Sequence, residues 1–133
     1  NKKYMRLFQN NPVLGHITTF GGHPVIAAAG YETLSITLKK NLHHKSLIKE
    51  KLFTSLLIHP KIREVRGRGL MLALILKDEE TAQKLVWNSL NEGLILFWLL
   101  YEKRAVRITP PLTITKSEII RGCKIILKVL DNI

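Results

Sequence analysis

Hydrophobic and polar positions repeat along the chain with two different periods. Apolar residues recur at helical spacing in four segments, and this predicts helices over residues 23–40, 44–58, 78–91 and 115–133. Strand-like alternation, or a short apolar run bounded by turn residues, predicts strands over residues 62–66, 70–76, 94–99 and 105–109. The first 22 residues show little periodicity, so we expect them to be loop-like.

Residues at the expected helix ends support these boundaries. Pro24 suits a first helical turn, where its missing N–H is not needed. Asp78 is a suitable N-cap, and Gly93 a suitable stop, for the third helix. Thr115 and Glu118 have the spacing of a capping box at the start of the last helix.

The order of elements is helix, helix, strand, strand, helix, strand, strand, helix. It predicts an α+β domain in which helices cover one face of a small, mainly antiparallel sheet. The 133 residues are enough for one domain with a hydrophobic core. Residues 1–22 look like the end of a different structural part.

The formal net charge of +11 is concentrated in one region. Nine basic residues but only two acidic ones lie between Lys39 and Arg68. This pattern is typical of a nucleic-acid patch, of solvated helix faces, or of one side of a boundary with an acidic partner. Phe53 is the only aromatic residue there, so the region lacks a platform for base stacking, and we expect no nucleic-acid partner.

Other composition signals limit the environment and the cofactors. The longest apolar run, Leu94 to Tyr101, is far shorter than the about 20 residues that span a bilayer, so we expect no membrane association. One cysteine, Cys123, excludes an internal disulfide and fits a reducing cytoplasm. His43 and His44 are adjacent on a helix and should point in different directions, so we expect no metal site.

Two segments carry candidate chemistry. From Gly15 to Pro24, two hydroxyl residues precede a glycine pair and a helix start, which suits either a phosphate ligand or an ordinary helix cap. Arg107 lies mid-strand with apolar neighbours that should face the opposite side. It is either a solvent-facing arginine or a guanidinium that grips a carboxylate with two hydrogen bonds. If Arg107 grips a carboxylate ligand, its guanidinium should be partly enclosed and should lack a full set of acidic partners from its own domain.

A third segment, Val65 to Met71, contains Gly67 and Gly69. These glycines suggest either a phosphate nest or a sharp turn between strands, and the turn is the better interpretation. No serine is paired with a histidine and an acid, and Cys123 falls on the apolar face of the last helix, so no nucleophile is expected.

Together and in this order, the three segments resemble the C-terminal portion of the class-III aminotransferases, which include acetylornithine, ornithine and 4-aminobutyrate aminotransferases. Gly15 to Pro24 resembles the family's Thr-Phe-Gly-Gly-Asn-Pro segment, with His23 at the asparagine position. Val65 to Met71 resembles its Val-Arg-Gly-x-Gly-Leu-Met turn, and Val106 to Leu112 its Leu-Arg-x-x-Pro-Pro-Leu strand. The resemblance extends over essentially the whole chain.

The resemblance implies a fold-type-I enzyme that depends on pyridoxal 5'-phosphate and works as a homodimer. Residues 1–22 would be the tail end of the large cofactor-binding domain, and residues 23–133 the linking helix and C-terminal small domain. Thr19 matches the threonine that contacts the cofactor phosphate of the neighbouring subunit. Arg107 matches the arginine that binds the substrate α-carboxylate.

The resemblance also implies what this chain lacks. The family's Schiff-base lysine lies earlier in the sequence, on the large domain, so we expect no catalytic residue in this fragment and no activity from it alone. The intact protein would transfer an amino group from an amino acid or amine to a keto acid. Two alternatives are a stand-alone basic module that binds nucleic acid and a small-domain homologue used only for dimerisation.

Overall fold

The computed structural model describes residues 1–8 and 18–133, and these form two units. The units are Asn1–Thr37 and Leu38–Ile133, and the division falls inside a helix.

The first unit contains more helix than its sequence pattern indicates. The prediction that residues 1–22 are loop-like is wrong at their start, where helix α1 spans Lys2–Met5 and a 3-10 turn, η1, spans Arg6–Phe8. Asn1 caps this helix, because its side-chain Oδ1 accepts a hydrogen bond from the backbone N–H of Lys3 at 3.1 Å. Four residues are too few for a periodic pattern, so only the cap could have indicated this helix.

Helix α2 spans Pro24–Lys39, close to the predicted range, and buries no side chain. Apolar residues lie exposed along its length, among them Val25, Ile26, Tyr31 and Leu34. A helix that exposes this much apolar surface is typical of one that packs against a further partner.

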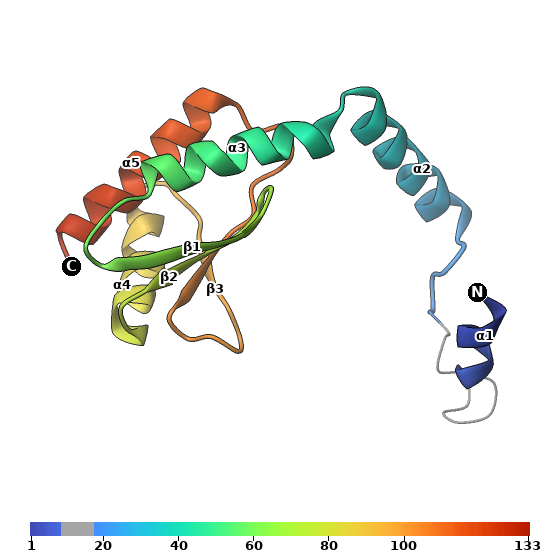
Figure 1. Ribbon diagram of the computed structural model, residues 1–133, viewed down its shortest axis with the longest axis horizontal. Coiled ribbons are helices and arrows are strands. Elements are labelled where there is room, and N and C mark those ends of the chain that lie inside the picture. Colours follow the sequence, from blue (N-terminus) through green and yellow to red (C-terminus); the bar gives the residue numbers. More distant parts are fainter. Residues whose placement is uncertain (9–17) are drawn as a thin grey trace. The chain divides into compact units, whose positions relative to one another are not determined.

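The second unit is an α+β domain, as predicted (Figure 1). Its helices are α3 (Leu42–Leu56), α4 (Glu79–Asn91) and α5 (Lys116–Asp131), and its strands are β1 (Ile62–Arg68), β2 (Met71–Leu76), β3 (Phe97–Trp98) and β4 (Ala105–Ile108). The strands pair antiparallel in the order β1-β2-β4-β3. No helix among residues 1–8 and 18–133 has the length and hydrophobicity needed to cross a membrane.

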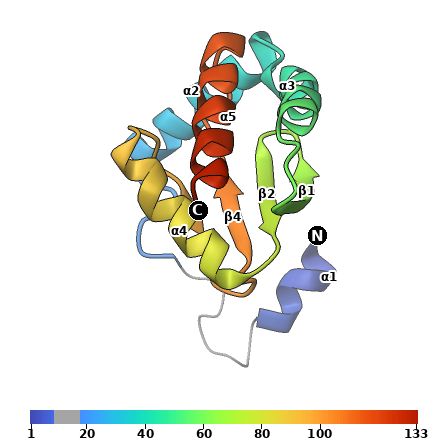
Figure 2. The same ribbon diagram turned by 90° about the vertical axis from the view of Figure 1, so that its left-hand side faces the viewer.

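The three helices cover one face of this sheet (Figure 2). The core lies between the helices and the sheet. The sheet contributes the side chains that alternate toward the helices, including Leu72, Leu74 and Leu76 of β2 with Val106 and Ile108 of β4. From α4 and α5 the largest buried side chains are Leu85, Ile119, Ile126 and Leu130. The alternation places polar residues of β1 and β4 on the opposite face, which we call the open face.

The predicted end signals of α4 and α5 are confirmed, whereas α3 begins and ends two residues earlier than the predicted 44–58. Asp78 Oδ1 accepts a hydrogen bond from the N–H of Thr81 at 2.7 Å, and Gly93 follows α4 with a φ of 78°. At α5, the N–H of Thr115 donates to Glu118 at 2.7 Å and the N–H of Glu118 donates back to Thr115 Oγ1 at 3.3 Å. This is the expected capping box.

Gly67 and Gly69 shape the hairpin that joins β1 and β2, which confirms the turn interpretation. Their φ angles are 136° and 62°. A Cβ atom added to Gly67 would lie 2.1 Å from the backbone oxygen of Met71. The N–H of Gly69 donates to the carboxylate of Glu50 on α3, which holds the hairpin against that helix. Side chains are therefore excluded at Gly67 by both conformation and space.

Strand β3 is shorter than predicted. Only Phe97 and Trp98 pair with β4, although the whole run 94–99 is apolar. Before them, the N–H of Leu94 donates to the carbonyl of Ser89 at 2.9 Å, so the chain is still tied to the end of α4. Hydrophobicity could not distinguish a strand from a connection that contributes side chains to the core.

Candidate functional site

Arg107 lies in the middle of the open face. It stands directly opposite Ala73 of β2 on one side and opposite Phe97 of β3 on the other. Ala73 in turn pairs with Arg66 of β1, so four side chains form one row across the sheet. The sequence neighbours of Arg107, Val106 and Ile108, are 0% and 5% exposed and belong to the core.

The guanidinium of Arg107 is exposed rather than partly enclosed as expected. Its Cζ atom lies 5.2 Å from the centroid of the Phe97 ring, a cation–π contact. Within residues 1–8 and 18–133 it forms neither a salt bridge nor a side-chain hydrogen bond.

Two nearby arginines behave differently. Arg66, in the same row, donates to Glu64 at 2.7 Å, and Arg104 donates to Glu102 at 2.9 Å. The hydrogen bonds from Arg104 lower the pKa of Glu102 to about 2, so this carboxylate stays ionised at neutral pH. Within residues 1–8 and 18–133, Arg107 is thus the arginine of this row whose donors have no acidic partner.

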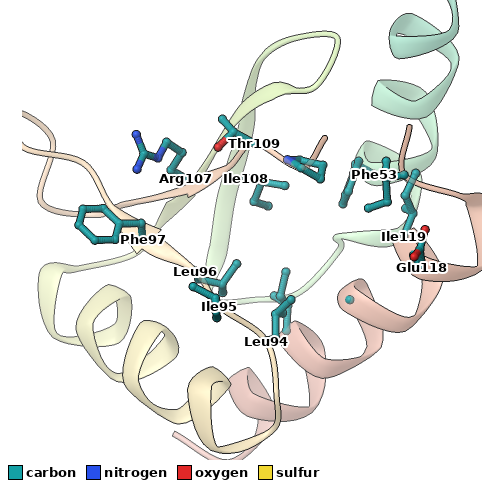
Figure 3. Close-up of a pocket in the computed structure, with 14 residues that line it drawn as sticks. Phe53, Leu94, Ile95, Leu96, Phe97, Arg107, Ile108, Thr109, Glu118 and Ile119 are labelled. Atoms are coloured by element: carbon teal, nitrogen blue, oxygen red, sulfur yellow. The ribbon is translucent and has the colours of Figure 1, made fainter. Parts of the chain in front are cut away.

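A pocket of about 330 Å³ adjoins Arg107 where residues 94–96 lead into β3. Its walls are largely apolar and come from β3, β4, the start of α5 and Phe53 of α3. Figure 3 shows Arg107 and Phe97 together on one side and Glu118 with Ile119 on the other. Glu118 is the acidic residue of this lining, and its hydrogen bonds from Thr115 lower its pKa, so it serves the helix cap rather than Arg107.

Thr19 belongs to the first unit and lies in the turns that precede α2. The N–H of Gly21 donates to the carbonyl of Thr18 at 3.3 Å, and the N–H of His23 donates to that of Phe20 at 3.1 Å. Thr19 itself is exposed. Residues 15–17 of the predicted phosphate segment lie outside the described residues.

The remaining candidates from the sequence are structural. Cys123 is 1% exposed, and burial raises the pKa of its thiol to about 11, so it is an inert core residue. The His43 and His44 rings are 4.5 Å apart, closer than adjacent helix positions suggest. Even so, the described part of the chain holds no group of three or more side chains suited to a metal.

The sequence did not indicate Phe97 as a candidate residue. Its contact with Arg107 depends on the register between β3 and β4, which spacing along the chain does not show.

Comparison with known proteins identifies relatives across nearly the whole chain. The family described as aminotransferase class-III matches residues 1–130. A putrescine aminotransferase of Pectobacterium atrosepticum is 33% identical over 95% of this chain and 28% of its own length. An ornithine aminotransferase of Schizosaccharomyces pombe is 27% identical over 89% of this chain, again 28% of its own length.

Solved structures show the same relationship. An aminotransferase of Bacillus anthracis matches 90% of this chain and 30% of its own, at 25% identity with a TM-score of 0.79. An acetylornithine aminotransferase of Elizabethkingia anophelis matches 89% of this chain and 32% of its own, at 29% identity with a TM-score of 0.77. The chain therefore spans less than a third of the length of these relatives. Its sequence match from end to end, together with an α+β domain that superposes on theirs, shows that it belongs to the class-III aminotransferase family.

Proposed function

We propose that this chain is the C-terminal part of an aminotransferase that depends on pyridoxal phosphate and moves an amino group from an amino acid or amine to a keto acid. Residues 1–22 are then the end of the large cofactor-binding domain, and residues 23–133 the linking helix and small domain. One observation supports the proposal beyond family membership: at the centre of the open face, the Arg107 guanidinium has no salt bridge within residues 1–8 and 18–133.

In this proposal Arg107 binds the carboxylate of the substrate. A guanidinium can donate two parallel hydrogen bonds to a carboxylate, which fixes its orientation as well as its position. Strand β4 is paired on both sides, so the backbone that carries Arg107 is held rigidly. The role of Arg107 is therefore to align the bound substrate, and such alignment lowers the activation barrier by reducing the entropy lost in the reaction.

Thr19 is the residue of this chain that we propose for the cofactor, through its phosphate. The hydroxyl stands exposed in a turn with glycines at 21 and 22, directly before the N-terminus of α2. Small residues, a hydroxyl and a helix N-terminus together suit a phosphate dianion. When bound, the cofactor supplies an electron sink for the bond that breaks at the substrate.

The same proposal includes a homodimer located in the cytoplasm, in which Thr19 serves the cofactor of the neighbouring subunit. Apolar side chains are exposed along α2, and this supports the proposal that α2 packs against further partners. In the intact protein these partners are the large domain and the second subunit.

The isolated 133-residue chain should show no transaminase activity, because the family's cofactor-linking lysine lies outside it. Amino transfer from ornithine, putrescine or alanine to 2-oxoglutarate or pyruvate is measured with added pyridoxal phosphate, for the chain and for the full-length protein. Borohydride reduction followed by mass spectrometry should find no specific lysine carrying the cofactor in the chain. Turnover by the chain, or failure of the full-length protein to transfer any amino group, contradicts the proposal.

In the full-length protein, Thr19→Ala should weaken retention of the cofactor. A hydroxyl that donates to a charged phosphate contributes about 1.5–3 kcal/mol, which corresponds to roughly ten- to a hundredfold in affinity. Cofactor content after dialysis is the measurement, and Thr113→Ala, at an exposed threonine before α5, is the matched control. Unchanged retention in Thr19→Ala removes this residue from the site.

A further inference from the structure

We propose that Phe97 is a positioning residue for Arg107. The Phe97 ring holds the Arg107 guanidinium in place and leaves the hydrogen-bond donors of the guanidinium free for a carboxylate. This inference rests on the substrate role proposed above for Arg107. It assigns a function to an aromatic residue that neither its sequence motif nor its exposure singles out.

The placement of the two side chains follows from strand register. Phe97 and Arg107 are directly opposite each other in the antiparallel pair of β3 and β4, so they leave the sheet on the same face. The Arg107 Cζ lies 5.2 Å from the ring centroid, within the about 6 Å at which a guanidinium is attracted to an aromatic face. On the other side stands Ala73, whose methyl group is too short to confine the guanidinium.

The chemistry of this contact differs from that of an ion pair. A guanidinium over a ring uses its flat face, whereas its N–H donors lie in its plane and point outward. A carboxylate partner would instead occupy those donors, as Glu64 does for Arg66 at 2.7 Å and Glu102 for Arg104 at 2.9 Å. An aromatic partner therefore orients Arg107 without competing with a substrate.

The Phe97 ring is itself supported from the body of the domain. It stacks on Trp98 with centroids 4.9 Å apart and planes tilted by 15°, and Trp98 contacts Trp87 of α4 at 5.9 Å. These contacts connect the aromatic face under Arg107 to a helix whose residues Leu85 and Val86 lie in the core. A supported ring makes a defined surface, because its own rotamers are restricted by packing.

The test uses the full-length holoenzyme and a keto acid, pyruvate or 2-oxoglutarate, whichever the wild type turns over. Phe97→Leu keeps an apolar side chain but removes the ring, and should raise KM for the keto acid about two- to fivefold, the range that an exposed cation–π contact supports, with kcat nearly unchanged. Phe97→Tyr keeps the ring and should retain the wild-type KM. In an Arg107→Ala background, Phe97→Leu should cause no further change, because the residue that it positions is gone.

Three outcomes overturn the inference. If Phe97→Leu leaves KM unchanged while Arg107→Ala raises it strongly, Arg107 keeps its proposed role and Phe97 does not position it. If Phe97→Leu lowers kcat or impairs folding and Phe97→Tyr shares the defect, the ring has a packing role only. If Arg107→Ala itself leaves KM and kcat for the keto acid unchanged, the proposed substrate role of Arg107 fails, and the positioning role fails with it.

Discussion

Arg107→Lys in the full-length protein should lower kcat/KM for carboxylate substrates about a hundredfold. A lysine keeps the positive charge but cannot reproduce the planar, two-pronged contact with a carboxylate. Loss of this charge-assisted geometry costs on the order of 3 kcal/mol, which corresponds to a factor of about a hundred in rate. Steady-state kinetics with the keto acid and with a carboxylate-bearing amino donor measure the effect.

The chain offers a matched control for this substitution. Arg66 lies in the same row of the open face, but its donors are already used by Glu64. Arg66→Lys should therefore leave kcat/KM within about twofold of the wild type, because an exposed ion pair contributes little free energy. If both lysine variants lower kcat/KM to the same extent, the effect belongs to the arginines of the face in general, and Arg107 has no special role.

Gly67→Ala should destabilise the second unit by about 3 kcal/mol or more. Its φ of 136° lies in a region open almost only to glycine, and the new Cβ would lie 2.1 Å from the Met71 carbonyl oxygen. The backbone of the β1–β2 hairpin must shift to relieve that contact, and the adjoining strand pairing suffers. Urea unfolding of the chain, followed by the fluorescence of Trp87 and Trp98, should show a lower transition midpoint.

Gly122→Ala is the corresponding control. Gly122 lies within α5, and an added Cβ would meet only Leu94 Cδ1 at 3.9 Å, an ordinary van der Waals contact. Because alanine is favoured over glycine in a helix by roughly 0.5–1 kcal/mol, this variant should be at least as stable as the wild type. Equal midpoints for the two alanine variants would show that the Gly67 conformation adapts without cost.

Local sequence signals predicted the parts of the fold that local interactions determine. Thr115 and Glu118 form the capping box that their spacing indicates, and Asp78 and Gly93 delimit α4 as expected. Each of these features depends on residues within four positions of one another, so spacing along the chain contains the necessary information.

Features that depend on pairing between distant segments could not be predicted from local spacing. The run 94–99 has the composition of a strand, but only Phe97 and Trp98 meet β4. The same register brings Phe97 onto Arg107, and no spacing along the sequence indicates that contact. Arg107 itself was a candidate from its motif and from the resemblance to a family. Only the structure shows that no acidic residue of the described part pairs with it, since Glu64 binds Arg66 and Glu102 binds Arg104.

The brevity of β3 also bears on self-association. The uncharged run from Leu94 to Tyr101 has the composition of segments that recruit further chains into aggregates, and β3 lies at an edge of the sheet. A long, flat edge strand of this composition would offer a row of free backbone groups as a template. Here only two residues of the run pair with β4, while Leu94, Leu96 and Trp98 turn their side chains to the core, so the run does not form a long, regular edge strand. The hazard is therefore greatest in nascent and unfolded chains, in which the whole run can adopt an extended conformation.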